Sequence, residues 1–346
     1  MSETMKQIVL ASRPNGIPTP ANFRLEEALL PIPAEGEVLV RVEYMSLDPY
    51  MRGRMDDAKS YAANIPVDSK MEGGSVGKII ASNADGFEIG DFVMGNFGWA
   101  THSVATAVGL AKIDPHAAPI TYSLGVLGMP GFTGWYGLSE LGKPKSGETL
   151  VVAAATGPVG SMVGQLAKSR GLHTVGIAGG PTKCKMAVEH FGFDVCLDHQ
   201  AYATASELRK AIKEAAPQGI DIYFENVGGK VLEAVMPLMN QHGRIPVCGM
   251  ISWYNEGGLG ADAVAKTLTG PKIWRTILVN FLSVNGFIIS NHWNRMGDFH
   301  KEVGPMITNG TVKVQEDITI GLENAPDAFI KLLTGGNIGK AIIKVI

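Results

Sequence analysis

The sequence has few cysteines, and they do not form a disulfide framework. Its 346 residues contain three, Cys184, Cys196 and Cys248, which are odd in number and widely spaced. Disulfide-stabilised secreted domains are small and have dense, paired cysteines, so these three are expected to be reduced thiols. The start of the chain also lacks the basic and apolar pattern of a secretory signal. Both observations predict a cytoplasmic location.

Charge is also scarce, and its two signs nearly balance. Charged residues make up 18% of the chain, with 30 Lys and Arg against 33 Asp and Glu. Nucleic-acid binding needs a clustered basic face, and the basic residues here are scattered, so no nucleic-acid partner is expected. A membrane helix needs about 18 or more consecutive apolar residues. No such run occurs, and no membrane partner is expected.

Apolar residues and glycine are abundant. Hydrophobic residues make up 45% of the chain, and there are 43 glycines. A chain this apolar and this weakly charged buries enough surface to fold, which excludes a disordered protein. At roughly 150 residues per domain, its length predicts two domains.

The first 125 residues are dense in Gly and Pro and hold short apolar runs, such as 37–44 and 74–80. Short runs bounded by turn-forming residues predict strands. This region is therefore expected to be a compact, barrel-like, mostly β unit without a long helix.

From residue 148 onward, apolar strands alternate with stretches of helical periodicity. Six strands are predicted, at 148–155, 173–178, 194–198, 219–225, 243–250 and 283–290. This alternation is typical of an α/β domain with a doubly wound parallel sheet, the Rossmann fold, here over 126–290. The remaining residues, 291–346, are expected to return to the first domain and complete it.

A glycine-rich turn follows the first of these strands. Ala155 to Gly160 has the spacing of the dinucleotide fingerprint, with alanine in place of the first glycine. Gly157 would let the backbone approach a pyrophosphate, and Gly160 would let the helix pack closely on the strand. Pro158 and Val159 complete the turn, and proline suits a first helical position because its missing N–H costs nothing there. The turn predicts a dinucleotide site.

The end of the second strand indicates which dinucleotide is bound. An NAD site has an acidic residue there for the ribose 2′-hydroxyl, but this position holds Gly179 and Gly180. Lys183 follows at the start of the next helix, where an ammonium group can reach a 2′-phosphate. His199, after the third strand, is a second candidate near the adenosine. The pattern favours NADP over NAD.

Ligands for a catalytic zinc are missing from the first domain. Residues 1–125 contain no cysteine, and the two histidines, His102 and His116, have no partner at a recognisable spacing. No metal is therefore expected. Without one, the protein must polarise its substrate by hydrogen bonding.

Several separated motifs together resemble the zinc-independent medium-chain reductases, in the branch of the prostaglandin reductases and plant double-bond reductases. The motifs are residues 47–52, 153–160, 224–229, 248–255 and 335–340. The opening residues 11–14 and the segments 124–132 and 148–160 are most similar to the bacterial curcumin and dihydrocurcumin reductases of that branch. The resemblance covers nearly the whole chain.

This resemblance implies a GroES-like catalytic domain from residues 1–125 and 291–346, an NADP-binding Rossmann domain from 126–290, and a homodimer joined through edge strands. The implied activity is NADPH-dependent reduction of the carbon–carbon double bond of α,β-unsaturated ketones and aldehydes. NADPH quinone oxidoreductase and a non-catalytic NADPH-binding protein remain as alternatives.

The resemblance also assigns residues to the cofactor. The turn Gly157, Pro158, Val159 and Gly160 would meet the pyrophosphate, and Lys183 the 2′-phosphate. Members of the branch place a tyrosine near the adenosine phosphate, where this chain has His199. The residues implied for the ribose, the nicotinamide and the C-terminal contact are Asn226, Cys248, Ser252, Tyr254, Phe287, Ile288 and Asn337.

In such a reduction, hydride adds to the β-carbon, negative charge develops on the carbonyl oxygen, and a proton reaches the α-carbon. Tyr50 and Tyr254 are the candidate hydrogen-bond donors to that oxygen, because a phenol donates without carrying charge. A ribose hydroxyl of the cofactor is the alternative donor. Arg52 is a candidate for contacting a polar substrate, with a structural role as its alternative.

Overall fold

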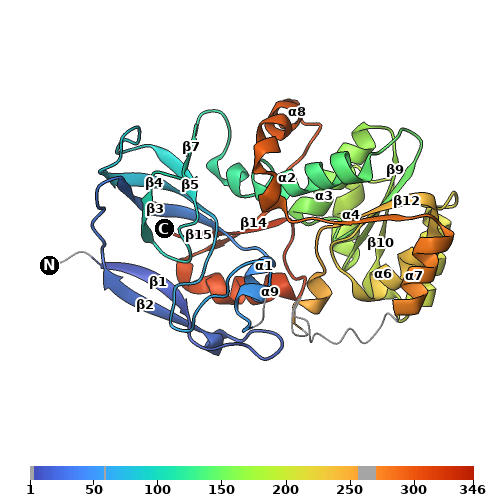
Figure 1. The fold of residues 1–346 in the computed structure, drawn as a ribbon, viewed down its shortest axis with the longest axis horizontal. Helices are drawn as coiled ribbons and strands as arrows, with labels where there is room; N and C mark the ends of the chain where they lie inside the picture. The colour runs from blue at the N-terminus through green and yellow to red at the C-terminus, as the bar shows by residue number, and fades with distance from the viewer. Residues whose placement is uncertain (1–3, 58–59, 256–269) are drawn as a thin grey trace. The chain divides into compact units, whose positions relative to one another are not determined.

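The computed structural model describes residues 4–57, 60–255 and 270–346 (Figure 1). The described chain divides into two compact units. The first takes in the residues up to Gly128, the pair Tyr254 and Asn255, and Glu316–Ile346. The second takes in Met129–Trp253 and the stretch from residue 270 to Gln315.

The first unit is mostly β, as the sequence predicts, and contains two sheets. β1 (Thr4–Leu10) and β2 (Phe23–Leu29) form an antiparallel pair. The larger sheet runs in the order β14 (Glu316–Ile320), β15 (Lys340–Lys344), β3 (Glu37–Ser46), β4 (Ser75–Ser82), β5 (Phe92–Gly95) and β7 (Ala111–Ile113), with β6 (His102–Thr106) paired to β3. Two short helices, α1 (Tyr50–Arg54) and α9 (Ala325–Leu333), accompany these strands.

The end of the chain completes this unit. β15 lies between β14 and β3 (Figure 1). It pairs parallel with β14 and antiparallel with β3, which places Ile343 beside Thr319 and Met45. Ile343 and Met45 are fully buried. The apolar final strand is therefore held by core packing as well as by its two ladders.

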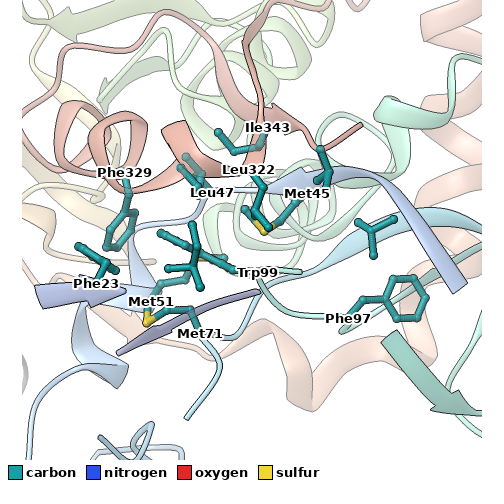
Figure 2. Packing of buried hydrophobic residues seen from close by; sticks show 14 of the residues in the cluster. Phe23, Met45, Leu47, Met51, Met71, Phe97, Trp99, Leu322, Phe329 and Ile343 are labelled. Carbon is teal, nitrogen blue, oxygen red and sulfur yellow. The ribbon is translucent and has the colours of Figure 1, made fainter. Parts of the chain in front are cut away.

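An aromatic group lies at the centre of the first unit's core (Figure 2). Trp99 stacks on Phe23 with ring centroids 5.5 Å apart, and Phe329 of α9 meets Trp99 edge-on at 5.6 Å. Leu47 and Met51, on either side of Tyr50, belong to the same core. Burial of these two side chains fixes the start of α1.

The second unit contains the predicted parallel sheet. Its strands lie in the order β10 (Val195–Asp198), β9 (His173–Ala178), β8 (Thr149–Ala153), β11 (Ile220–Phe224), β12 (Met239–Val247) and β13 (Ser283–Gly286). All neighbours are parallel. In chain order this is 3-2-1-4-5-6, so the Rossmann fold is confirmed.

Helices precede, connect and follow these strands. They are α2 (Met129–Tyr136), α3 (Pro158–Ser169), α4 (Pro181–Glu189), α5 (Ala205–Ala215), α6 (Gly229–Val235), α7 (Gly270–Val279) and α8 (Met296–Thr308). Within the described ranges, none has both the length and the apolar character that crossing a membrane requires.

The segment 291–315, expected to return to the first unit, packs in the second. Phe299 of α8 is fully buried, with its ring centroid 5.6 Å from that of Phe132 on α2. The indole of Trp135, also on α2, donates a hydrogen bond to Glu302 at 2.7 Å. These contacts keep α8 with α2, and the return to the first unit begins at Glu316 instead of residue 291.

Candidate cofactor and catalytic site

The glycine turn after β8 lets the start of α3 pack closely on the strand end. Gly157 precedes the helix, and its N–H donates to the Ala154 carbonyl at 3.0 Å. A Cβ placed on Gly160 would lie 2.3 Å from the same carbonyl oxygen, so only glycine fits. The positive end of the dipole of this 12-residue helix therefore lies directly at the end of β8, an arrangement that suits the phosphates of a dinucleotide.

The end of β9 is lined by side chains from the loop after β10. A Cβ on Gly179 would lie 2.9 Å from Nε2 of Gln200 and 3.2 Å from Nε2 of His199. Gly180, with a φ of 88°, precedes α4. The loop after the third strand therefore comes to the position where an NAD site carries its acid.

Asp198 is an acid at this place that the sequence analysis did not single out. Its Oδ1 accepts the backbone N–H of Gly180 at 2.8 Å and that of Gln200 at 2.9 Å. This oxygen thus bonds both the turn before α4, which contains Gly180, and the loop after β10, which contains Gln200. Asp198 ends the third strand, so its approach to the second strand end could be found only from the parallel pairing of β10 with β9.

Two lysines lie close to His199. Lys230 of α6 donates to the His199 carbonyl at 2.9 Å and to the Tyr202 carbonyl at 2.7 Å. Burial lowers the pKa of His199, and the Lys230 and Lys183 ammonium groups lower it further, against the opposing effect of Asp198. The structure thus brings together Lys183 and His199, two residues proposed separately for the cofactor, and adds Lys230. Two ammonium groups beside an imidazole that can donate a hydrogen bond suit a phosphate dianion.

The ends of β11 and β12 form the next part of the site. Asn226 donates from Nδ2 to the Ala153 carbonyl at 2.8 Å, which ties the end of β11 to the glycine turn. Ser252 donates from its N–H at 3.0 Å and from Oγ at 2.6 Å to the Val227 carbonyl. Asn226 and Ser252 therefore lie on two turns that are bonded to each other.

Cys248 lies at the same strand end but is not a nucleophile. Burial, and then the charge of Glu225, raise the pKa of its thiol to about 12. The thiol is protonated at neutral pH and nucleophilic attack needs the thiolate, so Cys248 acts as a small, partly buried side chain.

Phe287 and Ile288 follow directly after β13. The Phe287 ring is 5.8 Å from that of Tyr136, and a Cβ on Gly137 would lie 2.9 Å from its Cζ. Gly137 thus provides the space that Phe287 occupies. Packing on Tyr136 fixes the direction in which the chain leaves the sheet.

Tyr50 is the first residue of α1 in the first unit. Its side chain is partly buried against the core, and the Arg54 guanidinium lies 5.8 Å from its ring centroid. Burial, and then the neighbouring Asp48 carboxylate, raise the pKa of the phenol well above its usual value. Tyr50 is therefore a protonated hydrogen-bond donor throughout the neutral range.

Arg52 has contacts that favour the structural alternative. Its side chain is 1% exposed. Nη1 pairs with Asp56 at 2.5 Å, and Nη2 donates to the Gly16 carbonyl at 2.9 Å. These bonds hold the loop around Gly16 against α1 and leave no support for a substrate contact by Arg52.

Asn337 and Tyr254 also lie in the first unit. Asn337 is 9% exposed and donates from Nδ2 to the Gly339 carbonyl at 2.8 Å. Tyr254 is followed by Asn255, whose carbonyl oxygen lies 3.8 Å from the position of a Cβ on Gly16. The site residues therefore divide between the units. Tyr50, Tyr254 and Asn337 lie in the first, and the dinucleotide turn and its neighbours lie in the second.

Within the part of the chain that the structure describes, no three His, Cys, Asp or Glu side chains are grouped so that they could hold a metal ion.

Two family models match the chain. Residues 6–113 match the model described as "N-terminal domain of oxidoreductase", and residues 158–302 match the one described as "Zinc-binding dehydrogenase".

Known proteins similar to this chain cover nearly all of it. NADPH-dependent curcumin reductase of Escherichia coli strain K12 is 49% identical over 340 residues, which are 97% of this chain and 96% of that protein. Prostaglandin reductase 1 of Bos taurus is 37% identical over 95% of each chain. The crystal structure of CurA from Vibrio vulnificus in complex with NADPH is 46% identical, with a TM-score of 0.92 and 99% of both chains covered. The chain therefore belongs to the medium-chain dehydrogenase/reductase family, in the branch of the prostaglandin and double-bond reductases.

Proposed function

We propose that this protein is an NADPH-dependent reductase of the carbon–carbon double bond of α,β-unsaturated ketones and aldehydes, including enones of the curcumin and dihydrocurcumin type. The observation that carries the proposal is that His199 lies beside Gly179 and close to the ammonium groups of Lys183 and Lys230. Similarity to a curcumin reductase and to a CurA structure holding NADPH supports the same cofactor and substrate class.

The residues present fit NADPH. The lack of a Cβ on Gly160 lets α3 begin directly against the end of β8, so the backbone N–H groups of Gly157 to Gly160 would hold the pyrophosphate. Lys183 and His199 would hold the 2′-phosphate. Asn226, Cys248 and Ser252 would line the ribose and nicotinamide side, together with Phe287 and Ile288, and Asn337 would add a contact from the C-terminal segment.

When bound, NADPH supplies the hydride that the β-carbon of the enone receives. The residues of the chain then have to stabilise the negative charge on the carbonyl oxygen. Tyr50 suits this task because its raised pKa keeps the proton on the phenol, and Tyr254 is the second donor. In this proposal no metal takes part, and the α-carbon is protonated after the enolate forms.

The test is the loss of NADPH absorbance with purified protein and a panel of substrates: curcumin, a medium-chain alkenal, an aryl enone, a quinone and a simple aldehyde. Each is repeated with NADH. Enone turnover with NADPH, and a product saturated at the double bond, is the expected result. Turnover of the quinone alone would make the protein a quinone oxidoreductase. Tight NADPH binding without any turnover would make it a non-catalytic NADPH-binding protein.

The assembly that we propose is a homodimer formed through the edge of the second unit's sheet. β13 is the last strand of that sheet, and Val284 on it is 43% exposed. On the preceding segment Trp274 is 70%, Leu278 74% and Phe281 60% exposed. An open edge beside so much apolar surface is normally covered by a partner. Light scattering should give twice the chain mass, and Leu278→Glu should shift the protein toward monomer.

The cellular location that we propose is the cytoplasm, where reduced thiols such as Cys184, Cys196 and Cys248 are the norm.

A further inference from the structure

Glu225 is a buried carboxylate at the carboxyl end of β11. It is 1% exposed. Its Oε1 accepts the backbone N–H of Val227 at 2.6 Å and that of Gly228 at 2.9 Å. Two N–H groups of one turn thus converge on one carboxylate oxygen, an arrangement that stabilises negative charge in a buried place.

The backbone of Glu225 bonds the neighbouring strand end. Its carbonyl accepts the N–H of Cys248 at 2.9 Å and that of Gly249 at 3.2 Å, and its own N–H donates to Pro246 at 3.0 Å. One residue therefore holds the turn after β11 with its side chain and the turn after β12 with its main chain.

The second carboxylate oxygen is not balanced by a cation. Oε2 of Glu225 and the hydroxyl of Tyr223 are both buried, and the phenol acts on the carboxylate as a hydrogen-bond donor. The ionisable side chains that act on Glu225 or respond to it are Tyr223 on β11 and Cys248 after β12. Among the described residues, no Lys, Arg or His side chain contributes to the change in the pKa of Glu225. The N–H groups of the turn are thus the main partners of this charge.

We infer that Glu225 is a positioning residue, which holds the Asn226–Gly228 turn and the Cys248 strand end in the arrangement that binds the nicotinamide half of NADPH. This inference rests on the proposed function. Glu225 does not touch the reacting atoms. It acts through the residues that the proposal places against the cofactor. Loss of the carboxylate charge should therefore weaken cofactor binding more than it slows the chemical step.

The inference gives a direction for the dependence on pH. Burial raises the pKa of Glu225, and the N–H groups of Gly228 and Val227 oppose that rise. Tyr223 and Cys248 both have raised pKa values and stay neutral in the acid range. As the pH falls through the pKa of Glu225, the carboxylate takes a proton and loses its hold on the turn, and NADPH affinity falls.

The test compares Glu225→Gln with Glu214→Gln, the same change at an exposed residue of α5. The dissociation constant of NADPH is measured across pH by fluorescence, together with KM and kcat for the enone reaction. In Glu225→Gln the dissociation constant and the KM for NADPH should rise about tenfold at neutral pH, with a smaller change in kcat. The dissociation constant of NADH, measured in the same way, isolates Glu225 on the acid side because NADH has no 2′-phosphate to take up a proton, and its fall in affinity there should disappear in the variant. Glu214→Gln should match the wild type on every measure.

A Glu225→Gln protein with wild-type affinity and the wild-type acid limb would overturn the inference. If this variant does not fold, the wild type alone decides. The affinity for NADH must then fall as the pH falls through the acid range, because Glu225 lies away from the adenosine end and NADH has no 2′-phosphate. An NADH affinity that stays constant over this range refutes the role. A wild type that neither binds NADPH nor reduces enones would instead refute the proposed function.

Discussion

Lys340 and Asp48 form a buried ion pair, with 3.0 Å between Nζ and Oδ1, although they lie 292 residues apart in the chain. Lys340 also donates to the Leu47 carbonyl at 2.7 Å. The pair joins two motifs, at 47–52 and 335–340, that the sequence analysis singled out separately. Tyr50 follows Asp48 by two residues, so the ammonium group of β15 fixes the turn that carries this phenol.

Replacing Lys340 by Met should destabilise the protein and slow the reaction. The change leaves Asp48 buried without its partner, for which a loss of about 3–5 kcal/mol in the free energy of unfolding is typical. Lys331→Met is the matched control, because the Lys331 side chain is half exposed and such a pair with Asp317 is worth at most about 1 kcal/mol. Urea unfolding measures the stability of the two variants, and the enone assay measures their rates. If the Lys340 and Lys331 variants lose equal stability, the buried pair does not anchor the turn.

The sequence was sufficient to predict the second unit because its strands are short apolar runs that each pack locally against a helix. It could not place α8, because the Trp135–Glu302 hydrogen bond joins residues 167 apart. The burial of Arg52 was equally invisible, since its partner at Gly16 lies in a loop with no regular pattern.

The same distinction holds for the site. Gly157 and Gly160 could be recognised because the steric demand of the turn acts on neighbouring residues. Asp198 could not be recognised, because its bond to Gly180 depends on the pairing of β10 with β9. Lys230 could not be recognised either, because its bond to His199 depends on the reach of a lysine from α6. These contacts follow from strand order, which local patterns do not encode.

Removing the Tyr50 hydroxyl should slow the hydride step. A well-aimed donor to a developing oxyanion contributes about 2.7–4 kcal/mol, so Tyr50→Phe should lower the single-turnover rate about 10²- to 10³-fold. Tyr122→Phe, a partly buried tyrosine of the same unit, is the control and should react normally. If the double variant of Tyr50 and Tyr254 keeps the wild-type rate, a ribose hydroxyl of the cofactor holds the charge instead.

Lys183→Ala should weaken NADPH binding and leave NADH binding nearly unchanged. A hydrogen bond between charged groups is worth about 1.5–3 kcal/mol, so the dissociation constant of NADPH should rise about 10- to 100-fold. Lys185→Ala is the control on the same helix, because that side chain is 71% exposed and paired with Glu189. Titration of both cofactors by fluorescence measures the effect. Equal losses for NADPH and NADH would remove Lys183 from the phosphate site.

Elemental analysis of the purified protein should find no stoichiometric zinc, and chelators should leave the activity unchanged. The reason lies in the ligands, since residues 1–125 hold no cysteine and only His102 and His116 as histidines. One zinc per chain, lost together with activity on chelation, would replace the tyrosine mechanism with a metal-assisted one.

NADPH affinity should increase as the pH falls from about 8 to 6.5, a range in which the 2′-phosphate, with a second pKa of about 6, stays mostly dianionic. In the free protein the pKa of His199 is lowered by burial and by Lys230 and Lys183, so the imidazole is neutral. A bound dianion favours the protonated ring and raises that pKa. Binding then takes up a proton, and one proton changes affinity by at most about tenfold per pH unit.

NADH has no 2′-phosphate and should show no such slope. His199→Gln should flatten the slope for NADPH, whereas His116→Gln, at an exposed histidine of the first unit, should retain it. Calorimetry in buffers of different ionisation enthalpy counts the proton directly. A slope that persists in His199→Gln would mean that another group takes up the proton, and the preference for NADPH would then depend on the lysines alone.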